Sequence, residues 1–213
     1  MSKSSRDSDD NNCYNIESRE AFNVPQKIYS TLKKLKLNIK FAVEEDDYKH
    51  VLKENCFLDV DEVDLDFFGD YSDTIDHLII SLASSCPNVK KLNIRTEYRS
   101  TFTSFQTILS KCRSLEVFKF NSWDSCQKIS TMMEEALPVI CKNWPNLRYL
   151  ELDDWKLTRK QGRYLILNSQ NLQAVLGGTT LFVRSSAQMS EVATFFEDWG
   201  YDSGSVFEKL FVY

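Results

Sequence analysis

A short arrangement of apolar and polar residues recurs along the chain and predicts a series of equivalent β-strands. In the segment PNVKKLNIRT, the apolar residues Val89, Leu92 and Ile94 occupy relative positions 1, 4 and 6. Successive copies begin 25 to 35 residues apart, and a regular period of this size indicates a stack of repeated structural units. The seven copies begin at Leu32, Val60, Val89, Leu115, Leu147, Leu172 and Phe207.

Between the predicted strands, apolar residues recur at the three- and four-residue spacing of amphipathic helices. Thr158 is a suitable N-cap for the fourth of these helices, and Gly200 is expected to end the fifth. Pro138 falls inside the third helix, which we expect it to kink or end. The predicted helices cover residues 74–86, 101–112, 129–144, 158–170 and 186–200.

These alternating helices and strands predict an α/β fold built by stacking. One helix and one strand cannot bury both of their apolar faces, whereas neighbouring units together form a core between a parallel sheet and an outer layer of helices. Positions 4 and 6 then point into the core, and positions 3, 5 and 7 point to the other face of the sheet. The sixth copy has Gly177 in place of its last apolar residue, and the seventh ends with Leu210 and Val212 as expected core residues.

The L-x-x-L-x-L spacing, the helix in each unit and a period of about 28 residues resemble leucine-rich repeats of the ribonuclease-inhibitor-like type. The resemblance covers roughly residues 28–213 and implies a right-handed α/β solenoid of six or seven units, with the parallel sheet on its concave face and the helices on its convex face. We therefore expect a repeat domain over residues 25–213. The family's Asn or Cys at position 9 is absent, so its usual side-chain ladder cannot form there. Position 9 holds Phe68, Glu97, Trp123 and Trp155 in the four central copies.

Two strand lead-ins, Cys86-Pro87-Asn88 and Trp144-Pro145-Asn146, also resemble the repeat joints of F-box proteins that carry leucine-rich repeats. This second resemblance implies a substrate-recognition subunit of a ubiquitin ligase, bound to a Skp-type adaptor and a cullin. An F-box would have to lie in residues 14–58, where the stretch FAVEEDDYKHVLKENCFL departs from the family's pattern.

The composition is that of an ordinary globular chain, with 42% hydrophobic and 27% charged residues among 213. The formal charge of −5 does not favour binding to nucleic acid or to an anionic membrane, and no apolar run approaches the roughly 18 residues of a membrane span. Residues 1–24 are polar and lack a signal-peptide pattern, so we predict a disordered tail and an intracellular protein, cytoplasmic or nuclear. The six cysteines are then expected to be free thiols. Cys86 and Cys112 stand at equivalent points of the repeat and are predicted to be small buried residues at a turn.

The sequence offers no catalytic or metal-binding motif. Neither His50 nor His77 has a nucleophile motif nearby, and no two cysteines are spaced C-x-x-C. The acidic stretch DVDEVDLDFFGDYSD matches a calcium-binding loop at Gly69, but Phe68 and Ile75 stand where oxygen ligands are required. We therefore expect a protein that is not an enzyme and binds neither a cofactor nor a metal.

Positions 3, 5 and 7 predict a charged face whose sign changes from strand to strand, beginning with the basic row Lys34, Lys36 and Asn38. Adjacent strands lie about 4.8 Å apart, so opposite charges on them stabilise each other by roughly 0.2–1 kcal/mol per pair. Two interpretations are open: a face that neutralises itself and is merely solvated, or a patterned surface that binds a protein partner. The candidate partner-binding residues are Glu62, Asp64, Asp66, Lys91, Asn93, Arg95, Lys119, Asn121, Trp123, Tyr149, Glu151, Asp153 and Trp155.

The aromatic residues at position 9, Phe68, Trp123 and Trp155, lie just beyond the predicted strands. They either pack as core in place of the family's ladder or form an exposed rim that anchors a partner. Repeat stacks carry no chemistry of their own, so the expected function is non-catalytic binding of a protein partner through the concave face. The alternatives are a substrate receptor of a ubiquitin ligase and a regulator or inhibitor of a partner enzyme.

Overall fold

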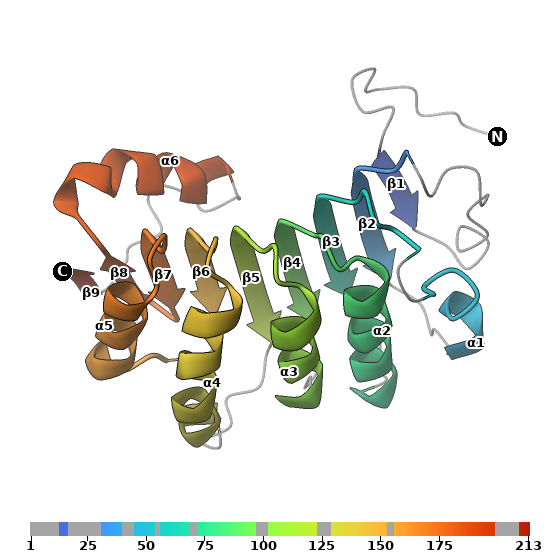
Figure 1. The fold of residues 1–213 in the computed structure, drawn as a ribbon, viewed down its shortest axis with the longest axis horizontal. Helices are drawn as coiled ribbons and strands as arrows, with labels where there is room; N and C mark the ends of the chain where they lie inside the picture. The colour runs from blue at the N-terminus through green and yellow to red at the C-terminus, as the bar shows by residue number, and fades with distance from the viewer. Residues whose placement is uncertain are drawn as a thin grey trace.

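A single sheet organises the molecule. The computed structural model describes residues 13–16, 31–39, 45–53, 56–68, 72–96, 102–122, 129–152, 156–198 and 209–213. In these residues a mixed α/β fold contains nine strands, whose order in the sheet follows their order in the chain (Figure 1). The strands are β1 (Cys13–Ile16), β2 (Lys34–Ile39), β3 (Glu62–Phe67), β4 (Lys91–Thr96), β5 (Val117–Ser122), β6 (Tyr149–Leu152), β7 (Ala174–Gly177), β8 (Thr180–Val183) and β9 (Lys209–Val212).

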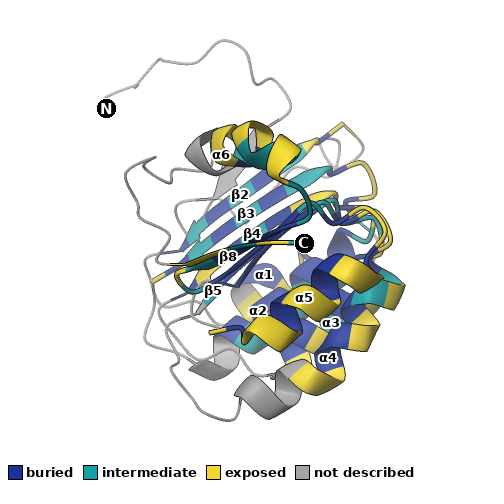
Figure 2. Ribbon diagram, turned by 90° about the vertical axis from the view of Figure 1, so that its left-hand side faces the viewer, coloured by how far each residue is buried: buried dark blue, intermediate teal, exposed yellow. Residues whose placement is uncertain are grey.

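Helices lie on both faces of this sheet. The helices α1 to α5 lie on one face, and α6 lies across the opposite face (Figure 2). The α6 position corrects the prediction that every helix packs on the same side. The helices are α1 (Glu45–Tyr48), α2 (Ser72–Ser85), α3 (Phe102–Lys111), α4 (Ile129–Asn143), α5 (Arg159–Asn168) and α6 (Met189–Asp198).

The predicted strand pattern is confirmed in the first six copies. Strands β2 to β7 pair in parallel, and equivalent residues of the repeat stand opposite one another. Each residue at position 4 is at most 2% exposed, because it points into the layer between the sheet and helices α1 to α5. This row consists of Leu35, Val63, Leu92, Phe118, Leu150 and Val175.

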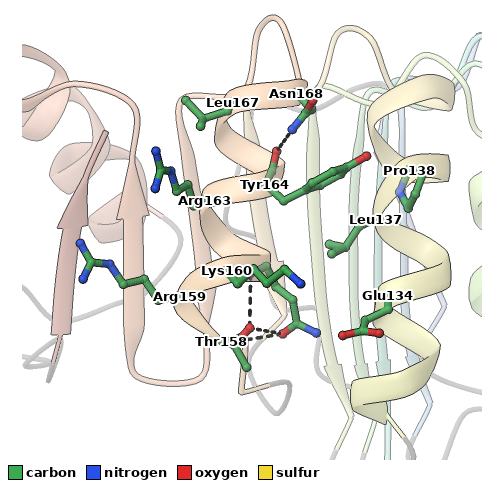
Figure 3. Close-up of a pocket in the computed structure, with 11 residues that line it drawn as sticks. Glu134, Leu137, Pro138, Thr158, Arg159, Lys160, Arg163, Tyr164, Leu167 and Asn168 are labelled. Carbon is green, nitrogen blue, oxygen red and sulfur yellow. Dashed lines mark hydrogen bonds between the residues drawn. The ribbon is translucent and has the colours of Figure 1, made fainter.

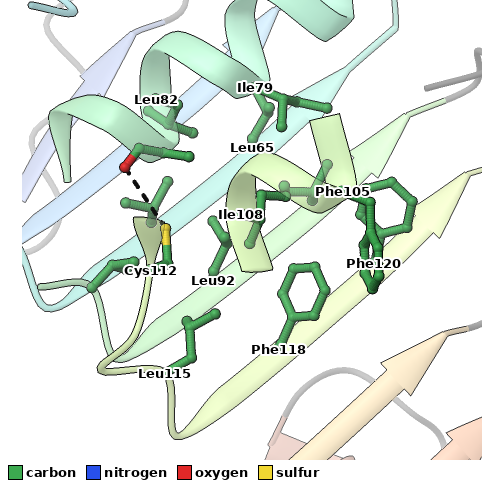
Figure 4. Close-up of a cluster of buried hydrophobic side chains, with 14 of the residues drawn as sticks. Leu65, Ile79, Leu82, Leu92, Phe105, Ile108, Cys112, Leu115, Phe118 and Phe120 are labelled. Carbon is green, nitrogen blue, oxygen red and sulfur yellow. Dashed lines mark hydrogen bonds between the residues drawn. The ribbon is translucent and has the colours of Figure 1, made fainter. Parts of the chain in front are cut away.

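The core repeats from unit to unit along the sheet. Leu92 and Phe118 from the strands belong to one cluster with Ile79 of α2 and Ile108 of α3 (Figure 4). Fully burying a side chain of this size contributes about 1.5–3 kcal/mol, so the stacked rows are the main source of stability.

Two cysteines fill equivalent places in this core, as predicted. Cys86 is 1% exposed and Cys112 is 0% exposed, and the Cys112 thiol donates a hydrogen bond to the carbonyl of Ala83 at 3.8 Å (Figure 4). Burial raises the pKa of Cys112 to about 12 and raises the pKa of Cys86 well above its ordinary value. Cys86, Cys112 and the half-buried Cys56 and Cys141 are free thiols.

We expect Cys86 and Cys112 to resist alkylation while the protein is folded. Only the thiolate reacts, and a thiol with a pKa near 12 is ionised in about one molecule in ten thousand at pH 8. Iodoacetamide treatment followed by peptide mass spectrometry should leave both residues unmodified in buffer and modify both in guanidinium chloride. The half-buried Cys56 and Cys141 are internal controls that should react sooner. Rapid labelling of Cys112 in native protein would contradict its buried position.

The N-terminal boundary of the fold differs from the prediction. Residues Cys13–Ile16 lie inside the segment predicted to be a disordered tail, yet they form β1 and pair in parallel with β2. Tyr14 and Ile16 stand opposite Leu35 and Leu37, so the short strand continues the repeat register. A four-residue strand satisfies the backbone groups at the edge of β2 but is too short to produce a recognisable period.

The sixth copy ends in a hairpin, so the expectation of an entirely parallel sheet is wrong at this point. Strands β7 and β8 pair in antiparallel fashion, and Gly178 in the connecting turn has a φ of 58°, a conformation that favours glycine. A Cβ added at Gly177 would lie 2.7 Å from Leu157 Cγ. Leu157, from the segment before α5, therefore takes the space that a third apolar residue of this copy would need.

The seventh copy is present, but its two faces are reversed. Strand β9 pairs with β8, and Phe211 stands opposite Phe182 on the core side, with the two rings stacked at 5.5 Å. Leu210 and Val212 are 48% and 45% exposed, so the prediction that they belong to the core is wrong. The cause is the inserted strand β8, because the alternation of β9 follows its neighbour and not the repeat.

Two expectations about the helices have different outcomes. Thr158 caps α5 as predicted, within a capping box in which the Gln161 backbone N–H donates to the Thr158 hydroxyl at 3.3 Å. Pro138 does not end α4, which continues to Asn143. Proline removes the hydrogen bond to the carbonyl four residues earlier, and Glu134 is exposed there, so water can satisfy that carbonyl.

Candidate functional site

The sheet face opposite helices α1 to α5 carries a regular grid of polar side chains. On β2, β3 and β4, three positions per strand point to this face, and the pairing places them in three straight rows. We call this grid the open face, because α6 lies over the other end of the sheet (Figure 1). Its residues are Lys34, Lys36, Asn38, Glu62, Asp64, Asp66, Lys91, Asn93 and Arg95.

Opposite charges on adjacent strands of the open face pair directly. The Lys34 ammonium lies 2.7 Å from the Glu62 carboxylate, and the Arg95 guanidinium donates to Asp66 at 2.7 Å and approaches its other oxygen at 2.5 Å. The Asn93 amide donates to Asp64 at 2.6 Å. These contacts hold the side chains in place, so the face presents a preorganised pattern of charge.

Two lysines of the open face keep unused binding capacity. Neither Lys36 nor Lys91 takes part in an ion pair among the described residues, and Lys91 is exposed. The side-chain carbonyl oxygens of Asn38 and Asn93 also have no hydrogen-bond donor within the described chain, but both atoms are buried and offer a partner no surface. A partner carboxylate could therefore contact the two ammonium groups without breaking the pairs already formed.

The same face becomes apolar beyond β5, where α6 covers it. Val192 of α6 is 1% exposed, and Phe195 stacks on Tyr149 with ring centroids 3.8 Å apart and planes 8° from parallel. Glu191 of α6 accepts hydrogen bonds from Arg148 at 2.8 Å and from the Tyr149 hydroxyl at 3.2 Å. The sheet residues beneath the helix are Val117, Tyr149, Ala174, Leu176, Leu181 and Val183.

Burial under α6 changes the ionisation of Tyr149. Desolvation raises the pKa of its phenol, and the nearby negative charge of Glu191 raises that pKa further. The phenol therefore stays protonated at neutral pH and donates its hydrogen bond to Glu191. Tyr149 thus holds α6 against the sheet, and its side chain is buried there.

An ion pair marks the boundary between the open face and the covered part. The Lys119 ammonium lies 3.1 Å from the Glu151 carboxylate, and the two side chains are only 9% and 4% exposed. The strand register places this pair between Asn93 of the open face and Leu176 beneath α6. Lys119 and Glu151 point to the predicted face but have little surface to offer a partner.

The structure therefore divides the predicted partner-binding residues into three groups. It brings together the three acidic residues of β3 with Lys91, Asn93, Arg95 and the half-buried Asn121. Burial contradicts the expectation that Lys119, Tyr149 and Glu151 stand open to a partner. Trp123, Asp153 and Trp155 lie outside the described residues, and the position-9 residue Phe68 is 43% exposed.

One feature of this face escaped the sequence-based prediction. Sequence periodicity identified α6 as a helix but did not show which side of the sheet it covers. The sequence does contain a pattern that indicates this side. The residues at the outward positions are polar on β2 to β4 but apolar at Ala174, Leu176, Leu181 and Val183. An apolar outward row requires a cover, and α6 follows β8 in the chain after one short 3-10 helix, Ser186–Gln188.

The helical side of the molecule carries a separate surface groove. It lies between α4 and α5, has a volume of about 880 Å³, and has Leu137, Pro138 and Tyr164 on its walls (Figure 3). Within the described residues, no group of three His, Cys, Asp or Glu side chains is arranged to hold a metal ion. In the same residues, no helix is long and apolar enough to cross a membrane.

Comparisons with known proteins add no family to this description. No protein-family model matches the chain, and no curated protein matches it.

Proposed function

We propose that this protein is a non-catalytic binding module of the leucine-rich-repeat type, which recognises a protein partner through the open face. The observation that supports this most strongly is the ordered grid on β2, β3 and β4. Paired charges lie there beside Lys36 and Lys91, which form no ion pair in the described part of the chain, and none of the described helices lies over them. Charge patterns of this kind select a partner by complementarity more than they add to affinity.

The charge of the open face favours a partner surface with carboxylates opposite its lysines. The acidic row of β3 is flanked by basic residues on both sides, and the pairs Lys34–Glu62 and Arg95–Asp66 neutralise most of its charge. The ammonium groups of Lys36 and Lys91, which form no ion pair with any described residue, then remain for an incoming acid. If the face were only solvated, the positions of the Lys36 and Lys91 ammonium groups relative to each other would have no consequence for binding.

The proposal predicts that reversing charge on the open face abolishes partner capture and leaves the fold intact. We expect Lys91→Glu with Arg95→Ala to lose a stoichiometric partner that the unchanged chain captures from cells, because both changes remove positive charge from exposed positions. Lys91 forms no ion pair among the described residues, so Lys91→Glu should change the free energy of unfolding by less than about 0.5 kcal/mol. Arg95→Ala breaks the partly exposed ion pair with Asp66 and should cost about 1 kcal/mol or less, which leaves the fold intact. Affinity purification with quantitative mass spectrometry, combined with thermal melting, measures both effects.

A matched control keeps this test specific. Lys142→Glu makes a charge reversal at an exposed residue of α4, on the other side of the molecule. It should capture the partner as the unchanged chain does. Equal capture by the open-face variant and the unchanged chain would refute binding through this face.

The same experiment separates the two more specific alternatives. Recovery of a Skp-type adaptor and a cullin, independent of the open face, would support the ubiquitin-ligase receptor that the strand lead-ins suggest. Recovery of one enzyme whose activity falls when this protein is added would support a regulator or inhibitor. We place the general binding role first because it rests on contacts in the described residues and not on resemblance alone.

A further inference from the structure

The sheet ends in an edge that can accept another strand. Strand β9 is the last strand of the described sheet and pairs with β8 alone. The Tyr213 N–H donates to the Val183 carbonyl at 3.0 Å, so residues at alternate positions from Tyr213 turn their backbone groups toward β8. The N–H and C=O groups of Leu210 and Val212 therefore point away from β8, and a row of backbone groups that pairs with no other described strand is a template for strand addition.

The side chains on one side of this edge are apolar and exposed. Leu210 and Val212 are 48% and 45% exposed, and they stand beside Leu181 and Val183, which are buried on the α6 side of the sheet. The apolar surface beneath α6 thus continues past β8 onto β9, where the two exposed side chains remain accessible. A strand that pairs with β9 would cover Leu210 and Val212 with every second side chain.

The side chains on the other side of the edge are basic and aromatic. The Arg159 guanidinium lies over the Phe211 ring at 4.9 Å, and the Arg163 guanidinium lies over the Tyr213 ring at 6.0 Å. Both arginines point away from α4, toward the last strands of the sheet (Figure 3). In the described part of the chain neither guanidinium pairs with a carboxylate, and Lys209 adds a third cation on this side.

We propose that the β9 edge binds an extended segment of a partner protein in which apolar and acidic residues alternate. The apolar side chains would cover Leu210 and Val212, the acidic side chains would meet Arg159, Arg163 and Lys209, and the backbone would pair with the outward groups of β9. A second copy of this chain does not fit, because a two-fold interface would bring the same three cations against themselves. This surface is separate from the open face, so it can bind whether or not the open face does.

A pair of short peptides tests this proposal directly. The probe is a fluorescently labelled, end-capped peptide of sequence Val-Glu-Val-Glu-Val-Glu, and the control is Val-Lys-Val-Lys-Val-Lys, which keeps the apolar row and reverses the charge. Fluorescence anisotropy with the full chain should show binding of the acidic peptide at least about tenfold tighter than binding of the basic one. Arg159→Glu combined with Arg163→Glu should reverse this preference.

Two substitutions at one residue separate backbone pairing from apolar contact. Val212→Pro removes an outward N–H but leaves the bonds to β8, a position where a strand tolerates proline. It should reduce binding of the acidic peptide at least about tenfold, whereas Val212→Thr, which keeps the N–H and a similar shape, should retain most of the binding. Thermal melting checks that both variants fold as the unchanged chain does.

Three results would overturn the proposal. The first is equal binding of the two peptides, and the second is undiminished binding of the acidic peptide by a folded Val212→Pro variant. The third is a concentration-dependent dimer in analytical ultracentrifugation that Val212→Pro abolishes, since the occupant of the edge would then be a second copy.

Discussion

Replacing Trp144 with alanine is expected to lower the free energy of unfolding by about 3–5 kcal/mol, the usual cost of removing a large buried aromatic side chain. Trp144 is 1% exposed and packs its ring against Phe118 at 5.1 Å and Phe105 at 6.2 Å, in edge-to-face geometry with both. Alanine would leave a cavity where α3, β5 and the end of α4 meet. Urea unfolding followed by circular dichroism measures the change without relying on tryptophan fluorescence.

Phenylalanine at the same position should be far less costly. The indole N–H of Trp144 is buried and has no hydrogen-bond acceptor in the described chain, so Trp144→Phe removes an unsatisfied donor while it keeps an aromatic ring in the cluster. We expect Trp144→Phe to cost less than half of what Trp144→Ala costs. Tyr164→Ala, on the exposed side of α5, is the control for loss of an aromatic residue and should cost less than about 1 kcal/mol. A cost for Trp144→Ala as small as this control would contradict the packing.

The repeated strands could be predicted from the sequence because apolar residues recur regularly at the positions that the fold buries. Leu35, Val63 and Leu92 stand in one buried row, and each is flanked by polar residues that face the other side of the sheet. The residue three positions before the start of a copy of the repeat was predicted only in part. Burial of Cys86 and Cys112 at this place was predicted, but the repeat did not indicate that a tryptophan, Trp144, is buried at the equivalent place before β6.

The ends of the sheet could not be predicted from the repeat, because other interactions decide their structure. The hairpin at Gly178 turns β8 antiparallel, and β9 then alternates in phase with β8. The turn itself had a visible signal, since a glycine pair between two apolar segments is typical of a tight hairpin. The exposure of Leu210 and Val212 follows from this inserted strand and not from any property of their own segment.

For the candidate site, the sequence predicted which face of the sheet each side chain points to, but only partly how exposed each side chain is. Alternation along each strand assigns every outward side chain to one face, and the structure places Asp64, Asn93 and Lys119 in one row on that face. Exposure depends on what lies above the face, and Phe195 of α6, which stacks on Tyr149, comes 46 residues later in the chain. A local pattern has no information about such a distant cover, so the burial of Tyr149 could not be predicted.

Because the pair Lys119–Glu151 is buried, removing one partner should change the free energy of unfolding more than it would for an exposed pair. Glu151→Leu is expected to lower the free energy of unfolding by about 3–5 kcal/mol, because it removes a carboxylate that lies 3.1 Å from a buried ammonium. Lys119→Met should destabilise the protein for the converse reason. The double variant should recover most of the loss, because two apolar side chains of similar volume remove both desolvation costs at once.

A double-mutant cycle in urea tests this coupling, with Lys34→Met and Glu62→Leu as a matched pair on the open face. Lys34 and Glu62 are also a lysine and a glutamate on adjacent strands, 2.7 Å apart, but their side chains are 26% and 32% exposed, against 9% and 4% for Lys119 and Glu151. Their coupling energy should be about 0.2–1 kcal/mol, well below that of the buried pair. If the losses from Lys119→Met and Glu151→Leu simply add in the double variant, the two charges are not coupled. The boundary of the covered face would then be held by packing under α6 and not by the ion pair.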